Sequence, residues 1–400
     1  MTRALPVVLG TSLAAALALG PALSSASPPP SRAPIQLGPG PEAWAESGLP
    51  AIRGLTIGPI ESARHPDVGY GSEPCGRTLD DSVSLGGNWV SFTPFGRVLD
   101  LKPTGIDLTF DTPFPENRAA VLAAIRQAHA RGLRVMLVPH LWVESGEWRA
   151  LIDPGDDAGW ARWAAAYRAF LLAWADVARE GEVELLSVGV ELRSWVTTTR
   201  VASFFPILDD VRKAYPGLLT YSANWDDVED TLILGHLDLV GINAFYPLAD
   251  HEGASPAELA EGGRRVAAKI ESFARAMNKP VVLTEIGYTT RPDPAVKPWE
   301  WPDAMTNVFV DERAQAEAYR GLIAPFLDAR WCAGFFVWRL YADPQDVSQE
   351  ADWGFSPRGK LAELVLRDAF AARWASDGPR LPGDSLGRFA ARRPGFFPDF

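Results

Sequence analysis

Two glutamates in this 400-residue chain stand at the ends of short apolar runs. Glu191 follows LLSVGV, and Glu285 follows PVVLT. Runs this apolar and β-branched are typical of buried parallel strands, which are covered on both faces. A carboxylate at the last position adds nothing to such packing. The two positions are therefore candidates for chemistry.

Paired carboxylates that face each other across a cleft are the groups that hydrolyse glycosidic bonds. One carboxyl group protonates the departing oxygen, while the other attacks the anomeric carbon or activates a water molecule. A single strand-end glutamate is as often a salt-bridge partner or a contact at a helix terminus. The prediction therefore depends on the pair and on the aromatic side chains around it.

The elements that must position these glutamates are eight apolar runs that alternate with segments of helical spacing. The runs are residues 53–57, 88–92, 134–140, 185–191, 218–224, 237–244, 280–285 and 332–338. The clearest helical stripe extends from Trp160 to Trp174, and the weakest helical pattern lies within 58–87. Strands that alternate with helices indicate βαβ units, and eight units predict an α/β fold, a single-domain (β/α)8 TIM barrel.

In such a barrel, the carboxyl ends of the strands meet at one mouth. The polar and aromatic residues at or just beyond these ends are His140, Glu191, Asn224, Asn243, Tyr246, Glu285 and Trp338. Glu191 ends the fourth run and Glu285 ends the seventh, so they lie on opposite sides of an eight-stranded barrel. We expect the two carboxylates to face each other across the mouth.

Tryptophan is concentrated in the loops and strand ends expected at this mouth. The residues are Trp142, Trp148, Trp195, Trp225, Trp299, Trp301, Trp338 and Trp353. Flat rings with C–H contacts and indole donors suit the faces of sugars. A single tryptophan more often packs within its loop, so the clustering is the signal, and it predicts a carbohydrate ligand.

Other chemistries have little support in the sequence. His140 and Glu144 have no HExxH motif or second histidine beside them, so no metal site is predicted. Ser187 lies in SVGVE and not in the GxSxG turn of a serine hydrolase. No GxGxxG follows the first run, and no GxxxxGKS or GxxxxGKT occurs, which disfavours a nucleotide site. We predict no cofactor.

The charge of the chain also excludes a class of partner. The net charge is −12, and no long basic block occurs, so the sequence has no electrostatic footprint for nucleic acid. We expect a β-linked oligosaccharide or polysaccharide as the partner and a monomeric enzyme.

The two ends of the chain differ from the middle in composition. Residues 1–26 have the pattern of a signal peptide, with Arg3, an apolar stretch and small residues, although an uncleaved membrane anchor is the alternative. Residues 27–50 are predicted to be a Pro/Ser/Gly-rich linker, 51–375 the barrel, and 376–400 an irregular tail. We therefore expect a secreted, periplasmic or cell-surface protein with no stable membrane partner after cleavage.

Two cysteines, Cys75 and Cys332, are present in the chain. They could pair in an oxidising compartment, but they fall at different levels of the predicted barrel, and a disulfide needs Cα atoms within about 7 Å. The fold is not expected to depend on a bridge.

Several motifs together resemble glycoside hydrolase family 113, a family of retaining β-mannanases among the clan A barrels. They are GGNWVSFTPFG, RVMLVPH, SVGVELRSW, SANW, GINAFYPL, KPVVLTEIGY and GFFVWRLYADP, in this order between residues 52 and 374. LTEIGY alone would be shared with many clan A enzymes, whereas the whole set is more specific.

The resemblance implies a role for each matching position. Glu191 would be the acid/base and Glu285 the nucleophile, with Tyr246 hydrogen-bonded to the nucleophile. Asn224 and His140 would contact sugar hydroxyls, and Trp338 would form the floor of the subsite that holds the glycosyl intermediate. Most clan A barrels have asparagine immediately before the acid/base, but here Val190 stands there, as in family 113. The group that binds the sugar 2-hydroxyl is therefore left unassigned.

The function that follows is a retaining endo-β-1,4-mannanase that uses two glutamates in a double displacement. Two alternatives stay open. An exo-acting β-mannosidase or another β-hexosidase would keep the chemistry, since the loops at 291–303 and 341–356 could close one end of the cleft. A non-catalytic carbohydrate-binding barrel would keep only the binding surface.

Overall fold

The computed structural model describes residues 34–58, 67–109, 112–300, 308–345 and 352–378. They belong to one compact unit, Pro34–Phe400. The predicted signal peptide at 1–26, Trp301 and most of the predicted tail lie outside the described residues.

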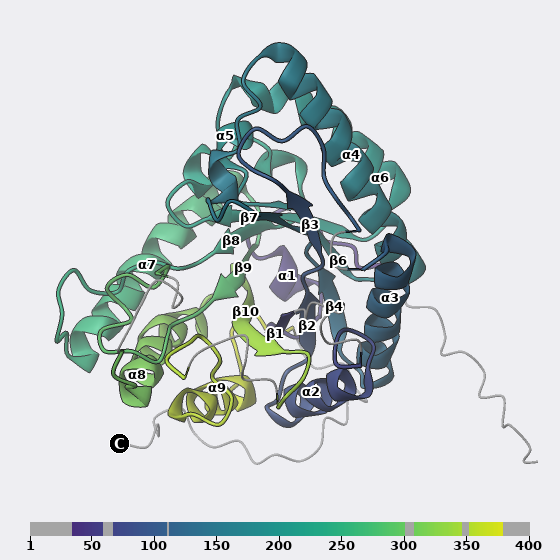
Figure 1. Cartoon of the computed structure of the whole chain (residues 1–400). Helices are drawn as coiled ribbons and strands as arrows, with labels where there is room; N and C mark the ends of the chain where they lie inside the picture. The colour runs from purple at the N-terminus through teal and green to yellow at the C-terminus, as the bar shows by residue number, and fades with distance from the viewer. Residues whose placement is uncertain (1–33, 59–66, 110–111, 301–307, 346–351, 379–400) are drawn as a thin grey trace, which may run out of the picture. The chain divides into compact units, whose positions relative to one another are not determined.

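Eight parallel strands close into a barrel in the order β1-β10-β9-β8-β7-β6-β4-β2 (Figure 1). The strands are β1 (Ile52–Gly58), β2 (Trp89–Phe92), β4 (Arg134–Leu137), β6 (Leu185–Val190), β7 (Leu218–Asn224), β8 (Val240–Asn243), β9 (Val281–Ile286) and β10 (Cys332–Tyr341). Each lies at one of the eight predicted runs. The predicted single-domain (β/α)8 barrel is therefore confirmed.

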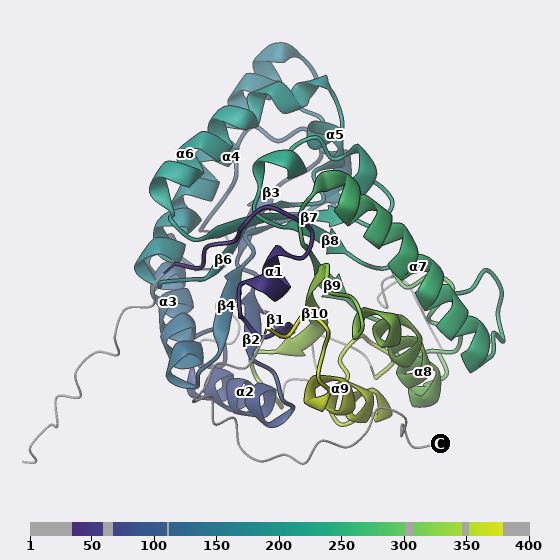
Figure 2. The ribbon, with the colours of Figure 1, turned by 180° about the vertical axis from the view of Figure 1, so that it is seen from behind.

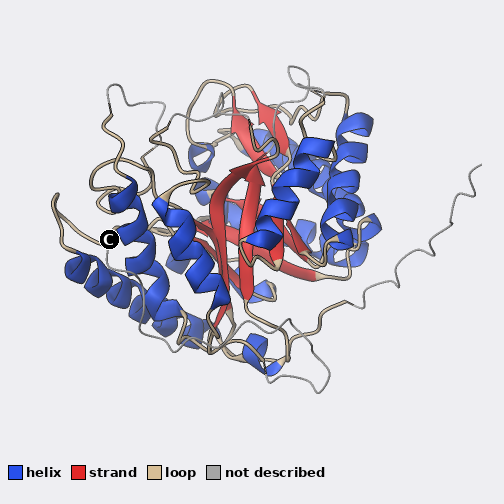
Figure 3. Ribbon diagram, turned by 90° about the horizontal axis from the view of Figure 1, so that it is seen from below, coloured by secondary structure: helices blue, strands red, loops and turns tan. Residues whose placement is uncertain are grey.

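Helices surround the strands, as Figure 3 shows with the strands in red at the centre. The α-helices of the described residues are α1 (Ala43–Glu46), α2 (Glu73–Ser84), α3 (Phe114–Ala130), α4 (Asp157–Glu180), α5 (Arg193–Val196), α6 (Phe205–Ala214), α7 (Pro256–Met277), α8 (Glu312–Ile323) and α9 (Leu361–Ala371). Local signals explain their bounds. In α7, Ser255 and Glu258 form a capping box, and Asn278 ends the helix in the left-handed conformation.

A second, two-stranded sheet was not predicted. It pairs β3 (Phe95–Val98) with β5 (His140–Val143), and Phe95 lies opposite His140. The sequence predicted one strand over 134–140, but β4 ends at Leu137 because Pro139 has no N–H with which to continue the ladder. His140 is therefore the first residue of a separate strand beyond the barrel and not the last residue of a barrel strand.

The end of the barrel opposite the mouth is closed by α1, which lies at the centre of Figure 2. Trp44 in this helix is fully buried and belongs to the apolar cluster inside the barrel, with its ring 6.1 Å from that of Trp89. The last part of the predicted linker is therefore packed structure, because its tryptophan fills this end of the barrel.

The start of the predicted tail is also packed. Asp377 forms an ion pair with Arg53 in β1, with Nη2 and Oδ2 2.9 Å apart, and accepts a hydrogen bond from the backbone N–H of Ala51. The N–H of Gly378 donates to the carbonyl of Leu49. Both flanks of the domain thus extend further than the predicted limits of 51 and 375.

The two cysteines, Cys75 and Cys332, are both free and buried.

Within the described residues, no helix has the length and apolar character needed to cross a bilayer.

Candidate active site

The two candidate glutamates come from barrel strands separated by β7 and β8. Glu285 lies in β9, and Glu191 follows the last residue of β6, where its N–H donates to the carbonyl of Ser222. Glu191 has a φ of 51°, a left-handed conformation that costs a residue with a side chain about 1 kcal/mol. Each glutamate is only 7% exposed. The fold therefore buries both carboxyl groups at the mouth, as predicted from their strand ends.

Glu191 accepts hydrogen bonds on both carboxyl oxygens. Trp148 Nε1 and Arg149 Nη2 each lie 2.9 Å from Oε2, and Asn243 Nδ2 lies 3.0 Å from Oε1. Arg149 belongs to the short 3-10 helix η1 (Arg149–Leu151), so one wall of the site comes from the loop after β5. The three donors come from two different elements and hold the carboxyl group in one position.

Glu285 is buried close to the negative charge of Glu191. Burial is the main cause that raises its pKa to about 8, and the Glu191 charge acts in the same direction. Positive charge on Arg149 and Arg339 and a hydrogen bond from Asn243 oppose these two effects. The site therefore favours the protonated form of Glu285 more than water does.

His140 faces Glu285 as a neutral imidazole. Burial, together with the positive charge of Arg149, lowers its pKa to about 3. Because the Val138 carbonyl, 2.9 Å from Nδ1, can only accept, Nδ1 carries the hydrogen. Nε2 is therefore an acceptor, and it lies 3.5 Å from Oε1 of Glu285. An imidazole acceptor beside a carboxyl group is compatible with a proton on Glu285.

A comparison with protein families identifies the family of this chain. The model of glycoside hydrolase family 113 matches residues 67–360, which is most of the chain and includes both glutamates. The chain belongs to glycoside hydrolase family 113. No curated protein sequence matches it.

Solved structures show the same barrel. A complex of a family 113 β-1,4-mannanase has a TM-score of 0.69 at 22% identity, covering 81% of this chain and 100% of that one. The family 113 β-mannanase AaManA from Alicyclobacillus acidocaldarius has a TM-score of 0.68 at 24% identity, with coverage of 81% and 98%. A family 5 mannosidase from Rhizomucor miehei has a TM-score of 0.59 at 12% identity, with coverage of 80% and 92%. At sequence identities below 25%, the structural similarity shows only that this chain has the same fold as these proteins.

Aromatic rings flank the glutamates of this family 113 enzyme on two sides. On the β5 side, Trp142 is 43% exposed and its ring lies 6.0 Å from Phe95. Beyond β7, Trp225 stacks on Trp299 with ring centroids 5.2 Å apart and an angle of 24°. Between them, Trp338 is buried and stacks on His140 at 6.0 Å. Trp142 and Trp299 are the exposed rings of this set.

Trp195 does not belong to this set. It was expected among the tryptophans of the mouth, but it lies in α5 and is fully buried against α4, with its ring 5.3 Å from that of Tyr167. Its indole N–H donates to Ser203 Oγ. Trp195 is therefore a packing residue, because α5 turns its ring toward the helix layer.

Asn224 and Tyr246, which the family resemblance predicts to contact sugar and the nucleophile, differ in their hydrogen bonding. Asn224 is buried at the end of β7, and its Nδ2 lies 2.6 Å from Asp226 Oδ1. The buried hydroxyl of Tyr246 has no hydrogen-bond partner among the described residues, so the bond to Glu285 implied by the family resemblance is not formed in this structure. The Tyr246 ring contacts Trp225 at 5.4 Å, on the side of β7.

Two residues beside the glutamates, Arg149 and Arg339, were not predicted from the sequence. Trp148 was expected among the tryptophans of the mouth, but its contact with Glu191 was not. Trp148 and Arg149 hold Glu191, and Arg339 lies over the Trp338 ring at 4.9 Å and lowers the pKa of Glu285. Arg149 belongs to a loop with no motif, whereas Arg339 directly follows the strand-end Trp338.

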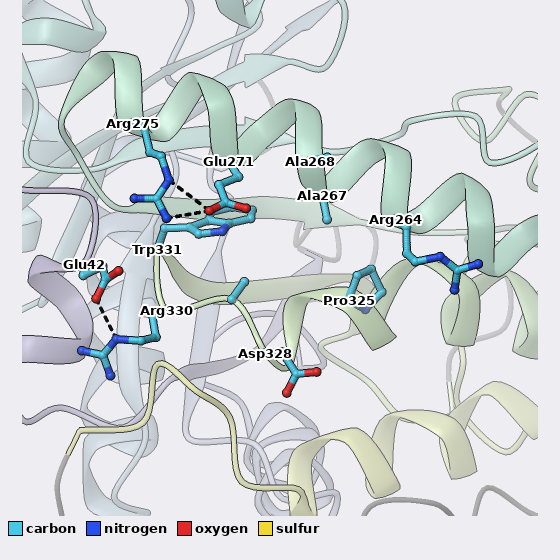
Figure 4. A pocket seen from close by; sticks show the side chains of 11 residues that line it. Glu42, Arg264, Ala267, Ala268, Glu271, Arg275, Pro325, Asp328, Arg330 and Trp331 are labelled. Atoms are coloured by element: carbon cyan, nitrogen blue, oxygen red, sulfur yellow. Dashed lines mark hydrogen bonds and ion pairs between the residues drawn. The ribbon is translucent and has the colours of Figure 1, made fainter.

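A hollow of about 360 Å³ lies away from the mouth, between α7 and the segment before β10 (Figure 4). Its walls carry ion pairs between Glu271 and Arg275 and between Glu42 and Arg330. These charges are paired within the protein, so we place the chemistry at the mouth.

Removal of the Arg149 charge is expected to change the pH dependence of the enzyme. Since this charge lowers the pKa of Glu285, Arg149→Met should raise that pKa. A smaller fraction of Glu285 is then ionised at any given acidic pH, so the acidic limb of kcat/KM should move to higher pH. The measurement is a pH profile of kcat/KM beside Arg168→Met, whose guanidinium pairs with Asp210 on the helix surface. An unchanged acidic limb in Arg149→Met would contradict Glu285 as the group whose ionisation sets that limb.

Proposed function

We propose that this family 113 enzyme is a retaining endo-β-1,4-mannanase. The observation that carries the proposal is the pair of buried glutamates, Glu191 after β6 and Glu285 in β9. Asn243 interacts with both, and the charge of Glu191 raises the pKa of Glu285. Two carboxyl groups at one mouth are the groups needed for double displacement. The family membership supports the same chemistry, and two of the similar structures are family 113 β-mannanases, one of them described as a β-1,4-mannanase.

In the first step, ionised Glu285 attacks the anomeric carbon, and the glycosidic bond breaks as protonated Glu191 gives its proton to the leaving oxygen. In the second step, ionised Glu191 takes a proton from water, the hydroxide attacks the same carbon, and Glu285 leaves as a carboxylate. Each glutamate returns to its starting state, so atoms and charge balance over the cycle.

The first step needs Glu285 in its ionised form, whereas burial and the negative charge of Glu191 raise the pKa of Glu285 in the free enzyme. Glu285 must therefore lose its proton before attack. We infer that this loss accompanies the binding of substrate, when sugar groups enter the site beside Arg149 and Trp148.

The position of the aromatic rings favours endo action over exo action. Trp142 extends the site on the β5 side, and Trp299 extends it beyond Trp225 on the opposite side. Sugars bound at both places would lie on either side of the glutamates, as in the middle of a polysaccharide. An exo-acting β-mannosidase would need only one of these surfaces.

A panel of β-linked glycans tests the proposal. We expect the wild type to release oligosaccharides of several lengths from β-1,4-mannan, with little release from β-glucan or xylan. Proton NMR of the first products should show the β-anomer, because two inversions retain the configuration. Release of mannose alone from one end of a defined manno-oligosaccharide would indicate exo action, and an α-anomer would exclude retention. Binding without any cleavage would favour the non-catalytic barrel.

A further inference from the structure

We propose that Thr284 is a positioning residue for the two glutamates: its hydroxyl fixes the side-chain amide of Asn243 with the nitrogen toward the carboxyl groups. The inference rests on the proposed catalytic role of those glutamates. The hydrogen bond of the Thr284 hydroxyl goes to Asn243 and not to a carboxyl group, so Thr284 acts through Asn243.

A β-bulge brings the two residues together. In the ladder between β8 and β9, Ile242 pairs with Leu283, and the next pair is Asn243 with Glu285. Thr284 is the extra residue, so two consecutive residues of β9 lie opposite one residue of β8. Bulges of this kind redirect side chains and are common beside active sites. Here the bulge places both Thr284 and Glu285 next to Asn243.

The hydrogen bonds of Asn243 use the two ends of its amide differently. Nδ2 donates to Glu191 Oε1 at 3.0 Å, and Oδ1 accepts from Thr284 Oγ1 at 2.9 Å. Asn243 is completely buried and Thr284 is 1% exposed, so water cannot easily replace either bond. A second N–H of the same nitrogen is available for Glu285, where Asn243 favours the ionised form.

Loss of the threonine hydroxyl would leave Oδ1 as a buried acceptor without a donor, which is unfavourable. Rotation of the amide would relieve this cost, because Oδ1 could then accept a hydrogen bond from a protonated carboxyl group. The proton would be retained on Glu285, the residue that must be ionised to attack. The hydroxyl therefore prevents the amide from stabilising the wrong protonation state.

The groups that face the two carboxyls from neighbouring elements are the same in all variants that change only Thr284. They are His140 from β5, Trp148 and Arg149 from the following loop, Asn243 from β8, and Arg339 from β10. A change in the titration of Glu285 on substitution of Thr284 would therefore be transmitted through Asn243.

The test compares Thr284→Val, which removes the hydroxyl at constant shape, with Thr284→Ser, which keeps it. Carboxyl ¹³C NMR of glutamate-labelled protein follows the titration of Glu285 without substrate, and Glu285→Gln identifies the signal. We expect the wild type and Thr284→Ser to titrate together and Thr284→Val to titrate at higher pH. Thr220→Val is the matched control, since the buried Thr220 hydroxyl donates to the Leu239 carbonyl and not to the site. Superimposed curves for Thr284→Val and Thr284→Ser would overturn the inference.

A double-mutant cycle then tests the route through Asn243. On the glycan that the wild type cleaves best, Thr284→Val should lower kcat by about 10-fold to 100-fold with KM nearly unchanged, and Thr284→Ser should stay within about threefold of the wild type. In an Asn243→Ala background, Thr284→Val should have no further effect. An equal loss in both backgrounds would show that Thr284 does not act through Asn243. A wild type that cleaves no glycan would refute the proposed function, while the NMR titration would still decide the inference.

Discussion

Glu285→Ala is expected to lower kcat on β-mannan by about 10⁴-fold or more, with binding of the glycan largely retained. The reason is that the glycosyl intermediate forms on this carboxylate in the proposed cycle, and no other carboxyl group in the described part of the site can replace it, since Glu191 is held by Trp148, Arg149 and Asn243. Initial rates on mannan and binding of manno-oligosaccharide by calorimetry measure the two effects separately.

Azide gives this substitution a mechanistic control. The shortened side chain leaves room for a small anion on the Glu285 side, so azide should restore turnover and yield the α-glycosyl azide by a single inversion. Glu261→Ala, which removes an exposed carboxylate on α7 that pairs with Arg264, should behave as the wild type. Hydrolysis that survives in Glu285→Ala without azide would refute the assignment of the nucleophile.

Glu191→Ala is expected to have the second largest effect, and the effect should depend on the leaving group. With mannan, whose leaving sugar needs a proton, we expect kcat to fall by about 10²-fold to 10⁴-fold. With an aryl β-mannoside whose phenolate leaves unaided, the first step should be nearly unaffected and the second should become limiting. A burst of phenolate in stopped-flow measurements would show the accumulated intermediate.

The product formed with azide separates the two glutamates. In Glu191→Ala, azide attacks the glycosyl-enzyme without help from a base and should give the β-glycosyl azide, the opposite anomer to that from Glu285→Ala. Glu191→Gln keeps the shape and the contact with Arg149, so it separates loss of the proton from loss of packing. Equal losses on mannan and on the activated aryl substrate would contradict the role of Glu191 as acid/base.

Much of the fold was predictable because its signals are local. The eight apolar runs overlap the barrel strands, and α7 begins at a capping box formed by Ser255 and Glu258 and stops at Asn278. The alternation of strands and helices then determines which strand ends meet. The sequence pattern therefore predicts that Glu191 and Glu285 lie at the same mouth.

The parts that were not predicted depend on contacts between distant segments. Arg149 reaches Glu191 across 42 positions in sequence, and its own loop has no motif that would identify it. The strands β3 and β5 have four residues each, too short to show a periodic pattern. Trp44 and Asp377 lie in segments whose Pro and Gly content indicates loops, while their burial depends on the barrel end and on Arg53.

The contact between Leu49 and Gly378 has a practical consequence for handling the enzyme. The chain enters the barrel at β1 and leaves after α9 at neighbouring points, on the face that α1 closes and opposite the strand ends that carry the glutamates. A tag, a fused binding module or an immobilising surface joined to either flank would therefore lie on the face of the barrel opposite the mouth. The catalytic mouth would remain directed toward an insoluble glycan, and the two flanks could be joined by a short linker to produce a circularly permuted enzyme.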